Sequence, residues 1–319
     1  MTQLVDETCA KSLRLLSLDG GGITAISQLI ILKSIMLSVQ QQQALPETPK
    51  PHEIFDLISG SGHGGLLALL LGRLHLSVDE AVFEYRQLAQ RVFSRPKRRS
   101  GNGKYSAHEM EAAIKDIIGR NTPDQNPETT LLEAESDTEQ EGSGEAARAV
   151  TAHPGMFKPL KVGVEEFVDG SLGTKNPCRL LLSEAGRLFD KRRSVGCVVS
   201  IGAGKPPPLQ LSRPGLFQRL LPTKIVSVVE SLSFEAEAVA RDMEERFEAS
   251  PDVYFRFNVG GRVADVDMAD WERENEVESK TFDYLAAFEI ETTVSRAAAA
   301  LYGENREVAT GKIMTVSDL

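Results

Sequence analysis

A glycine-rich turn at residues 59–65 (SGSGHGG) has the residue pattern most suited to chemistry. It stands between an apolar run and a helix-prone segment, where a GxSxG turn exposes a strained serine as a nucleophile. The flanking glycines of such a turn are here Gly60 and Gly64, and the residue at the centre is Gly62. The spacing of a nucleophile elbow is therefore present, but its central position has no side chain.

Two neighbours of Gly62 carry groups that could replace a serine hydroxyl. Successive side chains diverge around a tight turn, so we expect the hydroxyl of Ser61 to point away from the apex. His63 stands at a predicted helix N-terminus, where the dipole lowers the pKa of an imidazolium and keeps the ring neutral as a base. The competing interpretation is that His63 only fills space beside the turn.

A second glycine-rich turn, Asp19-Gly20-Gly21-Gly22, follows another apolar run. Consecutive glycines allow a turn whose backbone N–H groups point at one spot, and such a nest binds an anion. The anion could be a phosphate or the oxyanion of an acyl-transfer reaction, because the full GxGxxG spacing fails at Ala25. A plain tight turn is the competing interpretation.

Strands that end in glycine turns must position these residues. Apolar runs at residues 13–18, 54–58 and 195–201 each lead into a glycine-rich turn, and the first two turns lead into helix-prone segments. Further helices are expected at residues 78–93, 225–248 and 281–302, and a further strand at residues 253–259. This pattern predicts an α/β fold with a mainly parallel sheet, helices on both faces and sites at the carboxyl ends of the strands.

The whole chain, residues 1–319, is expected to form a single domain with one insertion. Residues 121–144 (NTPDQNPETTLLEAESDTEQEGSG) contain seven acidic residues, two prolines and no Lys or Arg. Such a segment buries too little apolar surface to offset the entropy of ordering the chain. We interpret it as a disordered linker.

Composition excludes several classes of protein. A net charge of -10 and a pI near 5.2 argue against nucleic-acid binding, and the basic run at residues 95–99 is expected to be a solvated loop that could touch anionic headgroups. Cys9, Cys178 and Cys197 have no CxxC spacing and an odd count, so we expect neither a disulfide framework nor a zinc site. Because the N-terminus lacks an apolar signal stretch, we expect a soluble cytoplasmic protein. We also expect no metal ion and no organic cofactor.

Three motifs resemble those of the patatin-like phospholipases, especially the versions found in fungal proteins. The family's glycine-rich oxyanion segment corresponds to LSLDGGGI, its serine elbow to FDLISGSGHGG, and its dyad aspartate to FVDGSLGTKNP. The segments EAARAVTAHPGMFKP, VVSIGAGKP and VYFRFNV are also similar, so the likeness runs through most of the chain. The resemblance implies a three-layer α/β/α fold, Asp169 as the catalytic aspartate, and Gly20, Gly21 and Gly22 as oxyanion donors.

The chain departs from the family pattern at several positions. Gly62 replaces the nucleophilic serine, Thr24 replaces the arginine after the glycine turn, and Ser171 replaces a small glycine or alanine. His153, in the TAHPG segment, stands where the family usually has a small residue. Related chains carry a sheet strand where this chain has residues 121–144, so we expect part of the sheet to be missing.

These observations lead to three functional hypotheses. The first is a lipid acyl hydrolase relative with a degenerate Ser-Asp dyad, which binds acyl or phospholipid groups, contacts membranes peripherally, and hydrolyses esters weakly or not at all. The second is an enzyme that uses His63, Asp169 and His153 for acid–base chemistry, such as a condensation, elimination or cyclisation, on an acyl-type substrate. The third is a slow esterase that attacks through Ser61.

Overall fold

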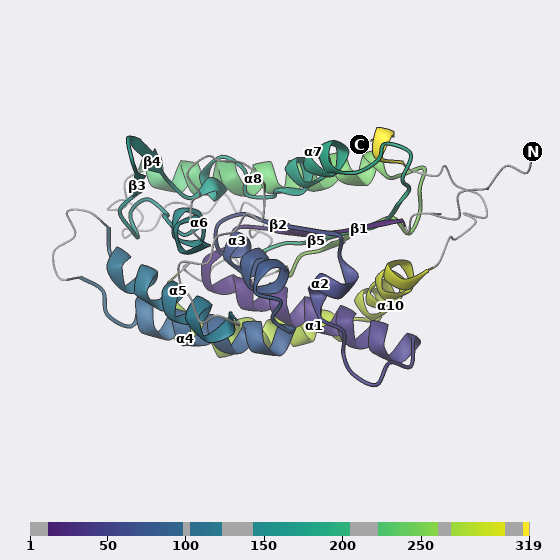
Figure 1. Ribbon diagram of the computed structural model, residues 1–319, viewed down its shortest axis with the longest axis horizontal. Helices are drawn as coiled ribbons and strands as arrows, with labels where there is room; N and C mark the ends of the chain where they lie inside the picture. The colour runs from purple at the N-terminus through teal and green to yellow at the C-terminus, as the bar shows by residue number, and fades with distance from the viewer. Residues whose placement is uncertain are drawn as a thin grey trace, which may run out of the picture.

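The structure is a computed structural model that describes residues 12–97, 103–122, 143–204, 223–260, 269–303 and 315–318. Its centre is a four-stranded sheet (Figure 1). The strands are all parallel and lie in the order β2 (Leu57–Gly60), β1 (Leu13–Leu18), β5 (Val195–Ile201) and β6 (Tyr254–Phe257). The expected α/β fold with a parallel sheet is confirmed.

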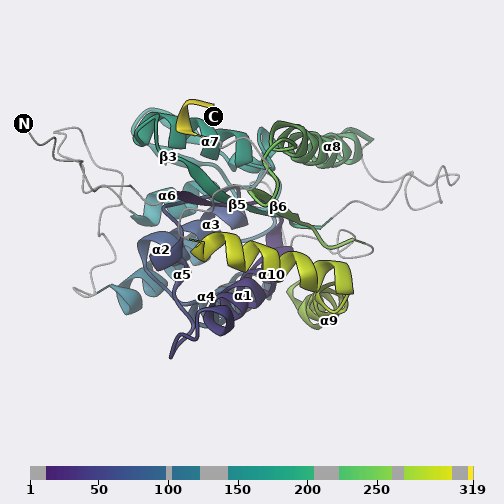
Figure 2. The same ribbon diagram turned by 90° about the vertical axis from the view of Figure 1, so that its right-hand side faces the viewer.

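Helices cover both faces of this sheet (Figures 1 and 2). One face carries α7 (Cys178–Leu188) and α8 (Thr223–Arg246), and the other carries α1 (Ala25–Gln42), α4 (Val78–Phe93), α5 (Ala107–Asn121) and α10 (Phe288–Tyr302). Helix α1 is buried along most of its length, because it packs between the sheet and the outer helices. The helical stretch Gly22–Gln42 is long and apolar enough to cross a membrane, but 78% of its apolar 18-residue window is buried inside the fold. We therefore assign α1 to the core.

Shorter elements connect these layers. They are α2 (Pro51–Ile54), α3 (His63–Ala68) with the π-helix Leu69–Arg73 that continues it, α6 (Ser143–Val150), α9 (Glu274–Leu285), the hairpin strands β3 (Leu160–Val162) and β4 (Glu165–Phe167), and the 3₁₀ turns Gly22–Thr24, Gly170–Leu172, Trp271–Arg273 and Val316–Asp318. The strand expected at residues 54–58 begins later, because a helical turn occupies Pro51–Ile54. The helix expected at residues 281–302 is divided between α9 and α10.

The strand register places the two glycine-rich turns side by side. Leu18, the last residue of β1, pairs with Gly60 of β2 on one side and with Ile201 of β5 on the other. Because the strands are parallel, their carboxyl ends meet at one edge of the sheet. The amide of Ser61 also donates to the carbonyl oxygen of Leu18 at 3.0 Å. The turn after β1 and the elbow after β2 are therefore in direct contact.

Most of the acidic segment 121–144 lies outside the described residues. Asn121 is the last residue of α5 and Ser143 is the first of α6, whereas residues 123–142 fall outside the described ranges. The expected disorder of this segment and the missing strand stay predictions.

Cys9 and residues 98–99 of the basic run also lie outside the described ranges. Cys178 and Cys197 are buried and form no disulfide with a described residue.

Candidate active site

The turn after β2 has the backbone geometry of a nucleophile elbow. Gly62 has φ +53° and ψ −126°, a conformation that residues with a side chain adopt only under strain. A Cβ atom at Gly60 would lie 2.0 Å from the carbonyl oxygen of Gly64, so the two arms of the turn approach too closely for a side chain there. The elbow is therefore formed, with glycine at its apex.

The carboxylate of Asp169 faces this apex. An ideal Cβ atom at Gly62 would lie 3.0 Å from Oδ1 and 3.1 Å from Oδ2 of Asp169. The Oδ1 atom accepts a 2.8 Å hydrogen bond from the amide of Ser171. The Oδ2 atom is buried and has no hydrogen-bond partner among the described residues. A side chain at position 62 would point directly at this carboxylate, which is the arrangement that a Ser-Asp dyad needs.

The surroundings of Asp169 make its carboxylate more basic and hold it in place. Burial raises the pKa of Asp169 above its ordinary value, while the Ser171 amide and the charge of His153 lower it in part. The amide of Asp169 donates to the carbonyl oxygen of Ala152 at 3.2 Å, which ties it to the TAHPG segment. Asp169 is thus a fixed group with one oxygen able to accept a proton.

The turn after β1 packs against the elbow and offers backbone amides. A Cβ atom at Gly20 would lie 2.6 Å from Cβ of Ser171. The amide of Gly20 donates to the carbonyl oxygen of Lys175 at 2.9 Å, so Gly20 is not available as the anion donor that the sequence suggests. No hydrogen bond to a described residue engages the amide of Gly21 or Gly22. The candidate nest therefore consists of these two amides.

Thr24 closes the same turn in place of the family's arginine. Its amide and its Oγ1 donate to the carbonyl oxygen of Gly21 at 3.3 and 2.6 Å. The hydroxyl of Tyr85 donates to the carbonyl oxygen of Gly22 at 2.6 Å. Each peptide unit is planar, so the fixed carbonyl group of Gly21 sets the orientation of the Gly22 amide before any anion binds.

A buried ion pair supports the β1 turn. Arg256 of β6 donates to both carboxylate oxygens of Asp19, at 3.0 and 2.6 Å, and to Oγ of Ser200 at 2.8 Å. The side-chain amide of Gln28 donates to the carbonyl oxygens of Asp19 and Ile201. The sequence gives Arg256 no role beyond its place in the VYFRFNV segment. A charged residue within a strand of the sheet is the signal that could have identified it.

His63 lies in an apolar environment. It is fully buried, and its ring packs against Tyr85 and Phe93 of α4 with centroid distances of 6.0 and 6.1 Å. Neither ring nitrogen has a hydrogen-bond partner among the described residues. Burial lowers the pKa of His63 to about 4, with a smaller effect from the charge of His153. The ring is therefore neutral at pH 7 because it is buried, whereas the sequence alone suggests the helix dipole as the cause.

Replacing His63 with leucine is expected to reduce the loss of stability in acid. The pKa is 6.5 for an ordinary histidine and about 4 for His63 in the folded protein, so the unfolded state binds more protons between these two pH values. The free energy of unfolding of the natural chain therefore falls as pH drops through this window, by about 3 kcal/mol. Urea unfolding at about pH 7 and about pH 4.5 measures the difference. The exposed His108 offers a control, His108→Leu, and equal pH dependence in both variants would contradict the prediction.

His153 and Ser61 take different positions relative to Asp169. His153 is half-buried, and its Nδ1 has no hydrogen-bond partner in the described part of the chain. Its charge acts on the pKa of both His63 and Asp169, although no hydrogen bond between described atoms joins it to either. The Oγ of Ser61 instead donates to the carbonyl oxygen of Thr174 at 2.6 Å. The site thus combines the elbow, Asp169 and the nest, with His153 beside them.

Known proteins are similar to this chain in sequence. Residues 16–182, more than half of the chain, match the family model described as patatin-like phospholipase. The chain is 27% identical to calcium-independent phospholipase A2-gamma of Homo sapiens, over 80% of this chain and 35% of that protein. It is 28% identical to "Probable inactive patatin-like protein 9" of Arabidopsis thaliana, over 65% of this chain and 64% of that protein. It spans about a third of the length of the gamma phospholipases that it matches. Because the family model matches more than half of the chain, including the elbow and Asp169, the chain belongs to the patatin-like phospholipase family.

Proposed function

We propose that this protein binds acyl lipids and hydrolyses their esters weakly or not at all. The observation that carries the proposal is the glycine at position 62, at the apex that faces the carboxylate of Asp169. Covalent acyl transfer needs a nucleophilic side chain at that place, and glycine has none. A relative whose name describes it as probably inactive is consistent with loss of hydrolysis within the family.

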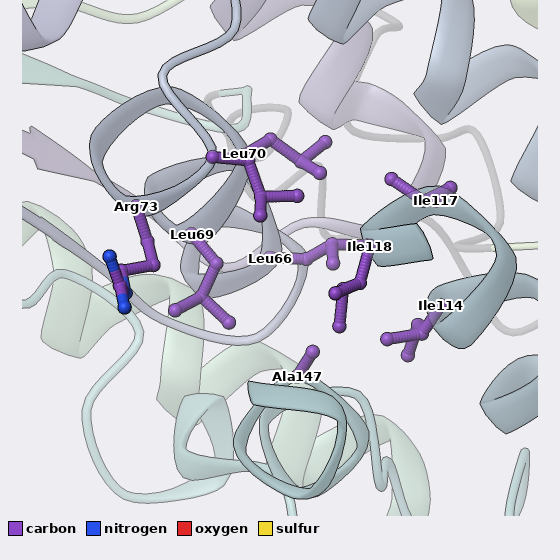
Figure 3. A pocket seen from close by; sticks show the side chains of 9 residues that line it. Leu66, Leu69, Leu70, Arg73, Ile114, Ile117, Ile118 and Ala147 are labelled. Carbon is purple, nitrogen blue, oxygen red and sulfur yellow. The ribbon is translucent and has the colours of Figure 1, made fainter. Parts of the chain in front are cut away.

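An apolar pocket supports the acyl part of the proposal (Figure 3). It is lined by Leu66, Leu69, Leu70, Arg73, Leu74, Ile114, Ile117, Ile118 and Ala147, from α3 and its π-helical continuation, from α5 and from α6. Figure 3 shows the aliphatic side chains converging, with the guanidinium of Arg73 at the margin. Helix α3, which begins beside Gly62, leads to this pocket. The free space inside this pocket is only about 20 Å³, so an acyl chain would bind here by displacing some of the lining side chains, and it would gain about 0.8 kcal/mol for each CH₂ group that it buries.

The acid–base hypothesis is the second candidate function. It is favoured by the place of His153 in the TAHPG segment, which the hydrogen bond from the Asp169 amide to the carbonyl oxygen of Ala152 ties to the aspartate. His63 would enter such chemistry as a neutral ring without a described hydrogen-bond partner. The hypothesis of attack through Ser61 requires its hydroxyl to leave the carbonyl oxygen of Thr174 and turn toward the apex.

Titration with a short-chain phosphatidylcholine below its micellar concentration tests the proposal. We expect saturable binding, measured by calorimetry, with little release of free fatty acid from the same lipid. Leu69→Gln should weaken binding, because it places an amide in the apolar pocket. Leu180→Gln on α7 is the matched control, because Leu180 is already 56% exposed. Fatty-acid release at the rate of a serine hydrolase, or no saturable binding, would contradict the proposal.

A further inference from the structure

We infer that the open cavity between α5, α6 and the β3–β4 hairpin binds the phosphate group of an acyl lipid whose headgroup is a phosphate monoester. The inference rests on the proposed binding of acyl lipids and specifies their headgroup. These elements lie together at one end of the molecule (Figure 1). The cavity has a free space of about 830 Å³, which is within the usual range for sites that hold small molecules.

A buried guanidinium without an acidic partner forms part of the cavity wall. Arg148 of α6 lines the cavity and is only 2% exposed. Its Nη2 donates to the carbonyl oxygen of Lys158 at 2.6 Å, whereas its Nη1 has no hydrogen-bond partner among the described residues. Burial lowers the pKa of Arg148, and the charge of Glu111 opposes this only in part. Because a buried charge without a counter-charge is costly, an anion at this wall is favoured.

The other charges of the cavity leave a second positive group for the ligand. Each carboxylate that lines the cavity has its own lysine partner, in the pairs Glu111–Lys115 and Glu166–Lys161. Lys158 also lines the cavity, is exposed, and has no ion pair with a described residue. Its ammonium group is therefore the contact for an anion, and Arg148 adds a second charge that little water screens.

Two positive charges without acidic partners match the charge of a phosphate monoester. Such a group carries about −1.5 to −2 charges at pH 7 and has three strong acceptor oxygens. The phosphodiester of phosphatidylcholine has a single negative charge, which its own choline group balances. The cavity should therefore distinguish the two headgroups by charge, with Lys158 as the contact and Arg148 as the buried charge beside it.

The TAHPG segment connects this cavity to Asp169. At one end of the segment, the carbonyl oxygen of Ala152 accepts from the amide of Asp169 at 3.2 Å. At the other end, Gly155 lines the cavity, and its carbonyl oxygen accepts from the amide of Lys104 at 2.9 Å. A headgroup in the cavity is thus held by the same segment that supports Asp169.

Calorimetric titration with a short-chain phosphatidate and with phosphatidylcholine of the same acyl chains, both below their micellar concentrations, tests the inference. Phosphatidate should bind at least about 10-fold more tightly, because its phosphate forms a charge-assisted hydrogen bond with Lys158. Inorganic phosphate should compete with phosphatidate but bind more weakly, because it has no acyl chain. Equal affinities for the two lipids, or inorganic phosphate that binds as tightly as phosphatidate, would overturn the inference.

Lys158→Met should lower the affinity for phosphatidate at least about 10-fold and leave the affinity for phosphatidylcholine unchanged. Arg148→Met should act in the same direction, and its melting temperature shows whether it is folded. Lys191→Met is the matched control, because Lys191 is also exposed and lies outside the cavity. An unchanged preference for phosphatidate in Lys158→Met, whose substituted side chain is exposed, would contradict the inference.

The two lipids also separate this inference from the proposed function on which it rests. Saturable binding of phosphatidylcholine without a preference for phosphatidate would refute the headgroup site and leave the proposed acyl binding in place. If phosphatidylcholine does not bind saturably, the proposed function itself is wrong.

Discussion

Gly62→Ser is expected to raise ester hydrolysis by about 10³-fold or more. Removal of the nucleophile from a serine hydrolase costs on the order of 10⁶ in turnover, which sets the upper limit of the gain. The serine Cβ would lie 3.0 Å from the carboxylate of Asp169, so the carboxylate must move by a few tenths of an ångström. The backbone already has the strained conformation of an elbow, so the substitution does not have to rebuild the turn.

A burst of p-nitrophenol and labelling by a fluorophosphonate would show that the new serine forms an acyl-enzyme. Gly163→Ser is the matched control, because it adds the same side chain at a similar φ with no group within 4 Å of its Cβ. The double variant Gly62→Ser with Asp169→Asn should lose the gain. If Gly62→Ser binds lipid as the natural chain does but is neither labelled nor faster, the remaining dyad and nest are not competent for acyl transfer.

The elbow could be predicted from the sequence because it is a local pattern at the end of a strand, whereas the role of Asp169 is implied by the resemblance of FVDGSLGTKNP to the family motif. Gly60 and Gly64 are required by the close approach of the two arms of one turn. Asp169 is followed by the glycine that begins a 3₁₀ turn. A parallel sheet then brings the turns after the neighbouring strands β1 and β2 to one edge, and this does not depend on the sequence of the rest of the chain.

Individual side-chain partners could not be predicted, because they depend on residues far away in the sequence. The Asp19–Arg256 pair joins β1 to β6, and the ring of His63 is enclosed by side chains of α4. The break between α9 and α10 falls at Ala286 and Ala287, and alanine is the best helix former. Ala287 is nevertheless extended, so packing of the two helices decides the break rather than local propensity.

Arg256→Met is expected to lower the free energy of unfolding by about 3–5 kcal/mol, because it leaves the Asp19 carboxylate buried without its ion-pair partner. Arg256 is 7% exposed and Asp19 is 1% exposed, so little solvent replaces the lost guanidinium. Urea unfolding of the natural chain and the variant measures the difference. Arg296→Met is the matched control, because Arg296 pairs with Asp252 at the surface and should contribute only about 0–1 kcal/mol.

The pH dependence of the Arg256→Met defect separates loss of the charge pair from loss of packing. Burial raises the pKa of Asp19, and Arg256 and Lys175 oppose this increase while the charge of Glu237 adds to it. Without Arg256 the pKa of Asp19 rises further, and the folded state then binds a proton that the unfolded state releases. The stability of the variant relative to the natural chain should therefore improve as pH falls from about 7 to about 5. A packing defect would be independent of pH. If the loss of unfolding free energy is the same at both pH values, the guanidinium of Arg256 stabilises the protein mainly by packing. A loss that grows in acid would contradict the assignment of Asp19 as the unpaired group.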